Sequence, residues 1–572
     1  MVAGRRSAIP TARVATFQAW RARRVVPGRH GWALASLAIA AVLAAPTLAV
    51  VGSAVAPTGE IWQHLASTVL ADYLANTAAL LVGVGVGVLV VGVGTAGLVT
   101  LCRFPGRGLC EWALLLPMAM PAYLVAYAYT DLLQFAGPVQ SGLRSWFGWR
   151  RGDYPFPEIR SLEGAIFVMT LVFYPYVYLL ARAAFLQQSR SLFETSRLLG
   201  RGPWRSFLSV SLPLARPAIA GGLALALMET LADFGTVQYF AVDTFTTGIY
   251  RTWFGMGSLV AAAQLAAVLL LGVLAVLGLE RLARGRARFH TAGAGAGPLP
   301  AFPLHGVRGA AALAACLVPV GLGFLVPGGA LLRMALSYGD ARAGTVFTQL
   351  AANTFVLAAV TAAIAVVLAV VLGYGLRVAP TALGRAATRA AVLGYAVPGA
   401  VIAVGVLAVF GALDRLLGGW LQATWGVSAG LLLSGTITGL VLAYLVRFLA
   451  AAFNTTEASL TKIPPSLDEA SRVLGHGLGS TLWRIHLPLL RGGLLTAALL
   501  VFVEVMKELP ATLVVRPFNF DTLAVRVYRL ASDERLAEAS TAALAIVLVG
   551  LLPVIVLSLA ISRSRHRVRS NE

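Results

Sequence analysis

The composition of this 572-residue chain is that of a membrane protein. Hydrophobic residues make up 58% of it and charged residues only 12%, whereas a soluble domain carries roughly 25% charged residues. Its apolar runs are long enough to cross a bilayer as helices and lack the alternation of barrel strands. The net charge of +21 lies mainly in short loops and tails, which favours membrane orientation over nucleic-acid binding. We therefore expect an all-α integral membrane protein that contacts lipids and binds no nucleic acid.

Hydropathy in chain order predicts about twelve transmembrane helices in two sets of six. The pattern predicts a basic tail at 1–30, a first half at 31–280, a basic Gly- and Pro-rich linker at 281–307, a second half at 308–562 and a tail at 563–572. The twelve helices are expected near 31–55, 76–101, 109–134, 163–187, 214–238 and 257–280, then near 308–333, 350–376, 387–411, 430–453, 491–513 and 541–562.

The charge distribution predicts which ends face the cytoplasm. Seven arginines lie in the first thirty residues, and the tail carries four more after residue 562. An even number of spans places both ends on one side, and the positive-inside rule makes that side the cytoplasm. The loop at 56–75, which contains no lysine or arginine, then lies outside.

The two halves are copies of one unit. Residues 191–213 read SLFETSRLLGRGPWRSFLSVSLP, and residues 466–488 read SLDEASRVLGHGLGSTLWRIHLP, 275 positions later. An even number of helices in each copy predicts two parallel six-helix repeats related by a pseudo-twofold axis along the membrane normal. The same spacing of 275 is expected to pair Glu229 with Glu504, Thr247 with Thr522 and Arg251 with Arg526.

Each repeated segment is predicted to form a short helix followed by the next span. Its first serine and the glutamate three residues later make a capping box. The glycine that follows suits the left-handed conformation that ends a helix, and Leu-Pro is expected to open the next span. The residues that carry these features are Ser191, Glu194, Gly200, Leu212 and Pro213, and Ser466, Glu469, Gly475, Leu487 and Pro488.

These segments resemble the "EAA" loop of the permeases of bacterial ABC importers. That loop has Glu-Ala-Ala, a glycine six residues after the glutamate, and then Leu-Pro. In place of Ala-Ala, the first copy has Thr195-Ser196 and the second has Ala470-Ser471, which are also small residues. The resemblance implies that each short helix docks into an ATPase subunit. The implied coupling residues are Ser191, Glu194, Arg197, Gly200, Leu212, Pro213, Ser466, Glu469, Arg472, Gly475, Leu487 and Pro488.

The same resemblance implies partners and a location. The chain has no GxxxxGK[ST] phosphate-binding loop, so ATP and Mg would be used by a partner ATPase dimer and no cofactor would be bound here. A fused permease of this kind lies in the bacterial cytoplasmic membrane and receives its substrate from an extracytoplasmic binding protein. The loops at 135–162, 239–256 and 514–540 are expected to contact that protein. An ion-coupled secondary transporter would explain the repeat but not two docking helices.

Three further stretches bear on the substrate. Residues 116–140, 228–251 and 507–528 are similar to fused permeases for ferric iron. Permeases for thiamine, and some for polyamines and phosphonates, are also similar, so these substrates remain alternatives.

Four carboxylates inside the predicted spans are candidates for a transport pathway. Glu229 and Glu504 occupy equivalent places, roughly 24 Å along their helices from the Leu-Pro proline. An ionised carboxylate in lipid is costly, so they must face the bundle interior, a cavity, or a partner such as Lys507 or Arg251. Asp233 and Glu508 are expected one turn later on the same face, and Tyr123, Tyr127 and Tyr174 could add oxygens.

The alternative is a hydrogen-bonded network that only holds the helices together. No stable metal site is predicted on either interpretation, because the histidines are scattered without metal-binding spacing. His476 and His486 are expected at the surface. The three cysteines, Cys102, Cys110 and Cys316, are expected to be unpaired thiols.

Overall fold

The computed structural model describes residues 29–57, 60–188, 195–196, 198–200, 202–284, 302–338, 343–428 and 430–569. Within these residues, eleven helices are long and apolar enough to cross a membrane. A twelfth span is a pair of helices, Arg107–Ala119 and Ala122–Phe147, bent by 91°. The expectation of an all-α protein with about twelve spans is therefore confirmed.

The first half begins with a long helix and ends with another, with a mixture of long and short helices between them. Its elements are α2 (Arg29–Ser53), α3 (Glu60–Thr68), α4 (Leu70–Leu101), β1 (Cys102–Arg103), α5 (Arg107–Ala113), η1 (Leu116–Ala119), α6 (Ala122–Leu133), α7 (Pro138–Phe147), α8 (Leu162–Leu186), α10 (Pro203–Ser206), η2 (Phe207–Ser211), α11 (Leu212–Ala232), α12 (Gly235–Tyr239), α13 (Phe245–Met256) and α14 (Leu259–Arg284).

The second half repeats this order. Its elements are β2 (Phe302–Pro303), α15 (Gly306–Val320), η3 (Gly321–Leu325), α16 (Val326–Tyr338), η4 (Ala343–Phe347), α17 (Thr348–Val378), α18 (Ala382–Val392), η5 (Leu393–Ala396), α19 (Gly399–Trp425), α20 (Ile437–Leu460), α21 (Pro465–Val473), α22 (Leu478–Thr481), η6 (Leu482–His486), α23 (Leu487–Met506), α24 (Pro510–Val515), α25 (Leu523–Ser532) and α26 (Leu536–Arg569).

Two predicted spans are broken at equivalent prolines. The sequence predicts continuous helices at 109–134 and 387–411, but each is interrupted by a 3-10 turn and an extended residue before Pro121 or Pro398. Proline cannot donate a backbone hydrogen bond, and it pushes the preceding residue out of the helical region. The single-helix prediction was wrong at both places, and the breaks set the entry to α6 and α19.

The fifth span of each half ends earlier than expected. The sequence predicts helices at 214–238 and 491–513, whereas α11 ends at Ala232 and α23 ends at Met506. A short separate helix, α12 or α24, follows each of them. Each break places an acidic residue where one helix stops and the next begins.

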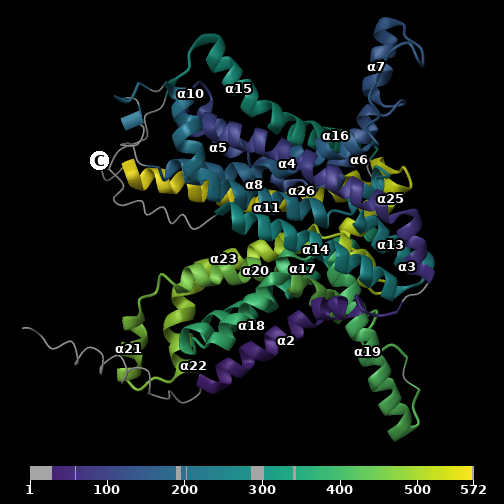
Figure 1. Cartoon of the computed structure of the whole chain (residues 1–572), viewed down its shortest axis with the longest axis vertical. Coiled ribbons are helices and arrows are strands. Elements are labelled where there is room, and N and C mark those ends of the chain that lie inside the picture. The colour runs from purple at the N-terminus through teal and green to yellow at the C-terminus, as the bar shows by residue number, and fades with distance from the viewer. Residues whose placement is uncertain are drawn as a thin grey trace, which may run out of the picture.

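The first helix of each half packs against the opposite half. Helix α2 lies against α17, α18 and α19 of the second half, whereas α15 and α16 contact α4, α5 and α6 of the first half. Figure 1 shows this exchange, with α2 beside the green helices and α15 above the blue ones. Buried apolar residues of both halves consequently form one continuous core.

Two short strands, β1 and β2, pair in parallel, and the Leu304 N–H donates to the Arg103 carbonyl at 2.8 Å. This contact ties the loop after α4 to the chain just before α15. It is the only sheet in the part of the chain that the structure describes.

Candidate functional site

A charged cavity lies between the two halves where α11 and α23 end. Its volume is about 90 Å³, and it receives side chains from α6, α8, α11, α20 and α23. Glu229 and Glu504 both line this cavity, as expected of carboxylates that must face a cavity or the bundle interior. Its polar lining residues are Tyr123, Tyr176, Glu229, Asp233, Arg447, Glu504, Lys507 and Glu508.

Asp233 and Glu508 line the cavity but are held by backbone groups. Asp233 Oδ1 accepts hydrogen bonds from the N–H groups of Thr236 and Val237 at 3.0 and 3.3 Å. Glu508 accepts from the N–H groups of Ala511 and Thr512 at 2.8 and 3.0 Å. The expectation that they continue the face of Glu229 and Glu504 one turn later was wrong, because α11 and α23 have ended there.

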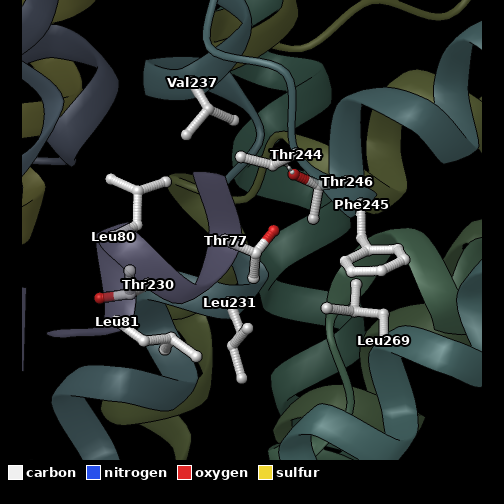
Figure 2. Close-up of a pocket in the computed structure, with 10 residues that line it drawn as sticks. All are labelled: Thr77, Leu80, Leu81, Thr230, Leu231, Val237, Thr244, Phe245, Thr246 and Leu269. Atoms are coloured by element: carbon white, nitrogen blue, oxygen red, sulfur yellow. Dashed lines mark hydrogen bonds between the residues drawn. The ribbon is translucent and has the colours of Figure 1, made fainter. Parts of the chain in front are cut away.

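Figure 2 shows the packing behind the Asp233 break. Thr230, Leu231, Thr77 and Thr246 line a void of about 10 Å³. The Thr246 hydroxyl donates to the Asp233 carbonyl at 2.8 Å. This hydroxyl thus satisfies a backbone carbonyl that has no helical partner after the break. The void itself is too small for a substrate.

Two basic residues, both from the second half, neutralise part of the cavity's acidity. Lys507 Nζ lies 2.9 Å from Glu504 Oε1, as predicted. Arg447 of α20 lies 3.3 Å from Glu508 Oε1 and 4.0 Å from Glu229 Oε2. Arg447 therefore bridges carboxylates of both halves, whereas Arg251, the other predicted partner, pairs with Asp243 instead.

Arg447 was missed from the sequence although a signal was present. It stands inside the apolar run VLAYLVRFLAAAF, and an ionisable residue within a span is a functional candidate by default. Gly399 makes room for it, because a Cβ there would lie 2.3 Å from the guanidinium and 2.9 Å from Glu508 Oε1.

Of the three predicted tyrosines, only Tyr123 lines the cavity. Tyr127 is fully buried against Tyr239, with ring centroids 4.4 Å apart. Tyr174 is also fully buried outside the cavity, while its neighbour Tyr176, which the sequence analysis missed, lines it. No group of three or more His, Cys, Asp or Glu residues suited to a metal occurs among the described residues.

The described parts of the repeated segments, which include α10 in the first and α21 and α22 in the second, lie at one end of the bundle (Figure 1). Ser191, Glu194 and Arg197 are outside the described residues. In the second segment, α21 is closed by two hydrogen bonds, from Gly475 N–H to the Arg472 carbonyl and from His476 N–H to the Ser471 carbonyl. These two bonds form a Schellman motif.

The predicted left-handed glycines are confirmed in both segments, with φ of +76° at Gly200 and +80° at Gly475. The predicted capping box at Ser466 and Glu469 was wrong. Helix α21 begins at Pro465 with Pro464 as its N-cap, since proline is pre-organised for the first helical turn. Ser466 therefore lies inside the helix.

Leu-Pro does not open the next span. The apolar spans run from Trp204 to Ala232 and from Leu478 to Met506, and each contains a π-helical turn just before Leu212 or Leu487. The prolines lack an N–H group, and the wider turn accommodates that lost donor without stopping the helix.

A pair of buried hydroxyls closes each repeated segment. Ser196 and Ser206 lie 2.8 Å apart, and Ser471 and Thr481 are also 2.8 Å apart. All four side chains are buried. The small residues at the third motif position therefore serve as hydrogen-bonding groups as well as permitting close approach.

The second segment has an additional anchor centred on Asp468. Its carboxylate lies 2.7 Å from an Arg377 nitrogen of α17 and 2.6 Å from His486 Nε2. His486 is fully buried, so its expected surface position was wrong. His476 is half-buried, so its expected surface position is only partly met. In the first half, Thr100 occupies the position equivalent to Arg377, and Ser211 occupies the position equivalent to His486. The first half therefore lacks these two basic residues.

Both segments expose apolar side chains at their tips. Leu198 and Leu199 are 88% and 72% exposed, and their equivalents Val473 and Leu474 are 87% and 76% exposed. Two matching apolar pairs on polar segments indicate a contact surface.

At the opposite end of the bundle, the predicted register of 275 was wrong beyond α12 and α24. Thr244 and Thr522 are the N-caps of α13 and α25, 278 positions apart. Asn76 donates to the Asp243 carbonyl and Asn353 donates to the Asp521 carbonyl. Three extra residues therefore precede α25 in the second half. Arg251 then corresponds to Arg529, because Arg251 pairs with Asp243 and Arg529 pairs with the equivalent Asp521.

The three cysteines are free thiols in the part of the chain described, as predicted. Cys110 and Cys316 are buried and Cys102 is half-buried.

Residues 88–288 and 365–570 each match the family described as binding-protein-dependent transport system inner membrane component. The chain belongs to this family. It is thus the permease of a binding-protein-dependent ABC importer, and the two matches cover equivalent helices of its two halves.

Relatives with different printed substrates are found. The chain is 27% identical to the Fe(3+)-transport system permease protein FbpB 2 of Haemophilus influenzae, over 85% of this chain and 90% of that protein. It is 31% identical to the molybdenum transport system permease protein ModB of Escherichia coli, over 26% of this chain and 62% of that protein. A putative 2-aminoethylphosphonate transport system permease protein PhnU of Salmonella choleraesuis is 28% identical, over 40% of this chain and 80% of that protein.

Proposed function

We propose that this permease imports ferric iron, powered by a separate ATPase dimer and supplied by an extracytoplasmic binding protein. The observation that carries the proposal is the charged cavity, in which carboxylates of both halves meet. Carboxylate oxygens are ligands that hard multivalent cations prefer. A similarity to an Fe(3+) permease that spans both halves adds support.

The repeated segments would dock the ATPase dimer. Each presents a left-handed glycine beside an exposed apolar pair, Leu198 and Leu199 or Val473 and Leu474. Two such segments at one end of a pseudo-twofold bundle match a partner that is itself twofold symmetric. This end would face the cytoplasm together with both termini, as the basic tails predict.

The opposite end would receive the binding protein. Helices α13 and α25 lie there, and their Asp243 and Asp521 are already paired with arginines of this chain. The loop at 135–162 contains α7, which projects from the bundle in Figure 1. Contact through such polar, ion-paired loops suits a transient complex.

The cavity favours an inorganic cation over the alternatives. Pockets for drug-sized organic molecules measure roughly 300–1,000 Å³, which is larger than the cavity of about 90 Å³, so thiamine and polyamines fit poorly. Four carboxylates against two basic groups oppose molybdate and phosphonate.

Uptake of radioactive ferric iron into proteoliposomes tests the proposal. The vesicles contain the permease with its ATPase, and the loaded binding protein is added outside. We expect uptake only with ATP, and competition by excess ferric iron but not by molybdate or thiamine. Uptake driven by an ion gradient without ATP would identify a secondary transporter, and ATP-driven uptake of molybdate alone would refute iron.

A further inference from the structure

The acidic residues of the cavity occur in both halves, whereas its basic residues occur in one half only. Glu229 and Asp233 of the first half correspond to Glu504 and Glu508 of the second. At the positions equivalent to Arg447 and Lys507, the first half has Val172 and Ala232, which also line the cavity. Both basic groups are therefore present in the second half only, beside an acidic site that both halves share.

The four carboxylates are not equally available. Asp233 and Glu508 are engaged by backbone N–H groups, as described above, and the Glu508 side chain is only 2% exposed. Glu229 and Glu504 are 26% and 27% exposed in the cavity. Their carboxylates face tethered cations, Arg447 at 4.0 Å and Lys507 at 2.9 Å.

A third oxygen in the cavity lacks a partner. Tyr123 lines the cavity and is 5% exposed, and its hydroxyl has no hydrogen-bond partner among the described residues. A buried hydroxyl without a partner is costly. A cation that enters this cavity would give the Tyr123 oxygen a partner.

We propose that Glu229, Glu504 and Tyr123 form a transit site for a hard multivalent cation, and that Arg447 and Lys507 are its resident counter-cations. The inference rests on the proposed import function and deepens it. Between passages, the two basic side chains neutralise Glu229 and Glu504, whose charges would otherwise be costly at membrane depth. An arriving multivalent ion displaces them and brings its own charge to the same oxygens.

The counter-cations also explain how the site releases its ion. Two carboxylates and one phenol form an incomplete shell, since hard cations take six or more oxygen ligands. Return of Lys507 and Arg447 to the carboxylates then competes with the bound ion. The basic groups thus lower affinity so that the ion leaves, which a pathway requires.

Terbium(III) serves as the probe, because tyrosines close to the ion sensitise its luminescence. The full-length permease is titrated alone in a non-ionic detergent without phosphate, and the variants are checked for monodispersity and unfolding temperature. We expect weak binding by the unmodified protein and about tenfold tighter binding by Lys507→Met, because a competing charge is removed. Lys462→Met, which alters the chain's other and exposed lysine, is the matched control and should not differ from the unmodified protein.

Glu229→Gln with Glu504→Gln should abolish the sensitised signal, and Tyr123→Phe should weaken it. Glu457→Gln, at an exposed position of α20, should leave it unchanged. Equal signals from the double variant and the unmodified protein, or no gain from Lys507→Met, would refute the site. Because ATPase and binding protein are absent from the titration, that failure would leave the importer function standing, whereas loss of ATP-driven uptake would not alter the terbium result.

Discussion

The two repeated segments share one shape but are fastened differently. Each has a left-handed glycine, a buried hydroxyl pair and an exposed apolar tip. Among the described residues, the second segment has a charged contact to the bundle, from Asp468 to Arg377 of α17, and Asp468 also contacts His486 of η6 within the segment. The shape presented to a partner has thus been kept after duplication while the attachment to the bundle diverged. A movement of the second segment therefore acts directly on α17 through Asp468 and Arg377, whereas the first half has Thr100 at the position of Arg377.

The largest effect is expected from the shared glycines. Gly200→Val with Gly475→Val forces a β-branched residue into the left-handed region, at a cost of roughly 1–2 kcal/mol for each site. We expect ATP-driven uptake to fall more than tenfold, or the ATPase to detach from the membrane. Gly477→Ala is the control, since Gly477 has an ordinary φ of −73° and open space at its Cβ. Normal uptake by the double variant at normal expression would refute the docking role of both segments.

An intermediate effect is expected from the anchor of the second segment. Asp468→Asn weakens the contacts to Arg377 and to buried His486. A buried group that loses its hydrogen bond costs about 1–3 kcal/mol. We expect the lower part of that range because the Asp468 side chain is 20% exposed. We expect uptake to fall several-fold while the ATPase stays bound, so that more ATP is hydrolysed per ion.

Asp533→Asn, an exposed aspartate at the other end, is the control for the anchor. If Asp468→Asn transports with the unmodified ratio of ion to ATP, the second segment works without its anchor and the two segments are mechanically equivalent.

The smallest effect is expected from the hydroxyl pairs. Ser196→Ala and Ser471→Ala each remove one buried hydrogen bond, worth about 1 kcal/mol. We expect similar small losses of thermal stability and less than a twofold change in uptake from either. Calorimetry on the purified variants measures this, and a large difference between them would mean that the shared shape is not equally important in the two segments.

Much of the molecule was predictable because its signals are local. Apolar runs predicted the spans, the repeated residues predicted the glycine conformations, and the cost of a carboxylate in lipid predicted that Glu229 and Glu504 face a cavity or the interior. Two further signals are present in the sequence but were not used in the prediction. They are Arg447, and the pairs Asp243-Thr244 and Asp521-Thr522 that set the register of 278.

Other features depend on contacts that no local pattern encodes. From the sequence His486 resembles a loop residue, but the fold places Asp468 and the Tyr374 ring against it. The ends of α11 and α23 depend on where the Asp233 and Glu508 side chains find N–H groups. Helices α2 and α15–α16 each pack against helices of the opposite half. The two halves present similar apolar surfaces, so hydropathy cannot predict which half each helix contacts.

The exchange of first helices has a consequence for synthesis. Helix α2 leaves the ribosome first, but the helices that cover it, α17, α18 and α19, begin near residue 348. Roughly 300 residues must therefore be translated before these three helices can cover α2, which also packs against α14 of the first half. The first half cannot be finished before the second is made, so maturation of this permease is a late, whole-chain event instead of two successive ones. A chain stopped at the linker would leave uncovered the faces of α2 that pack against α17, α18 and α19.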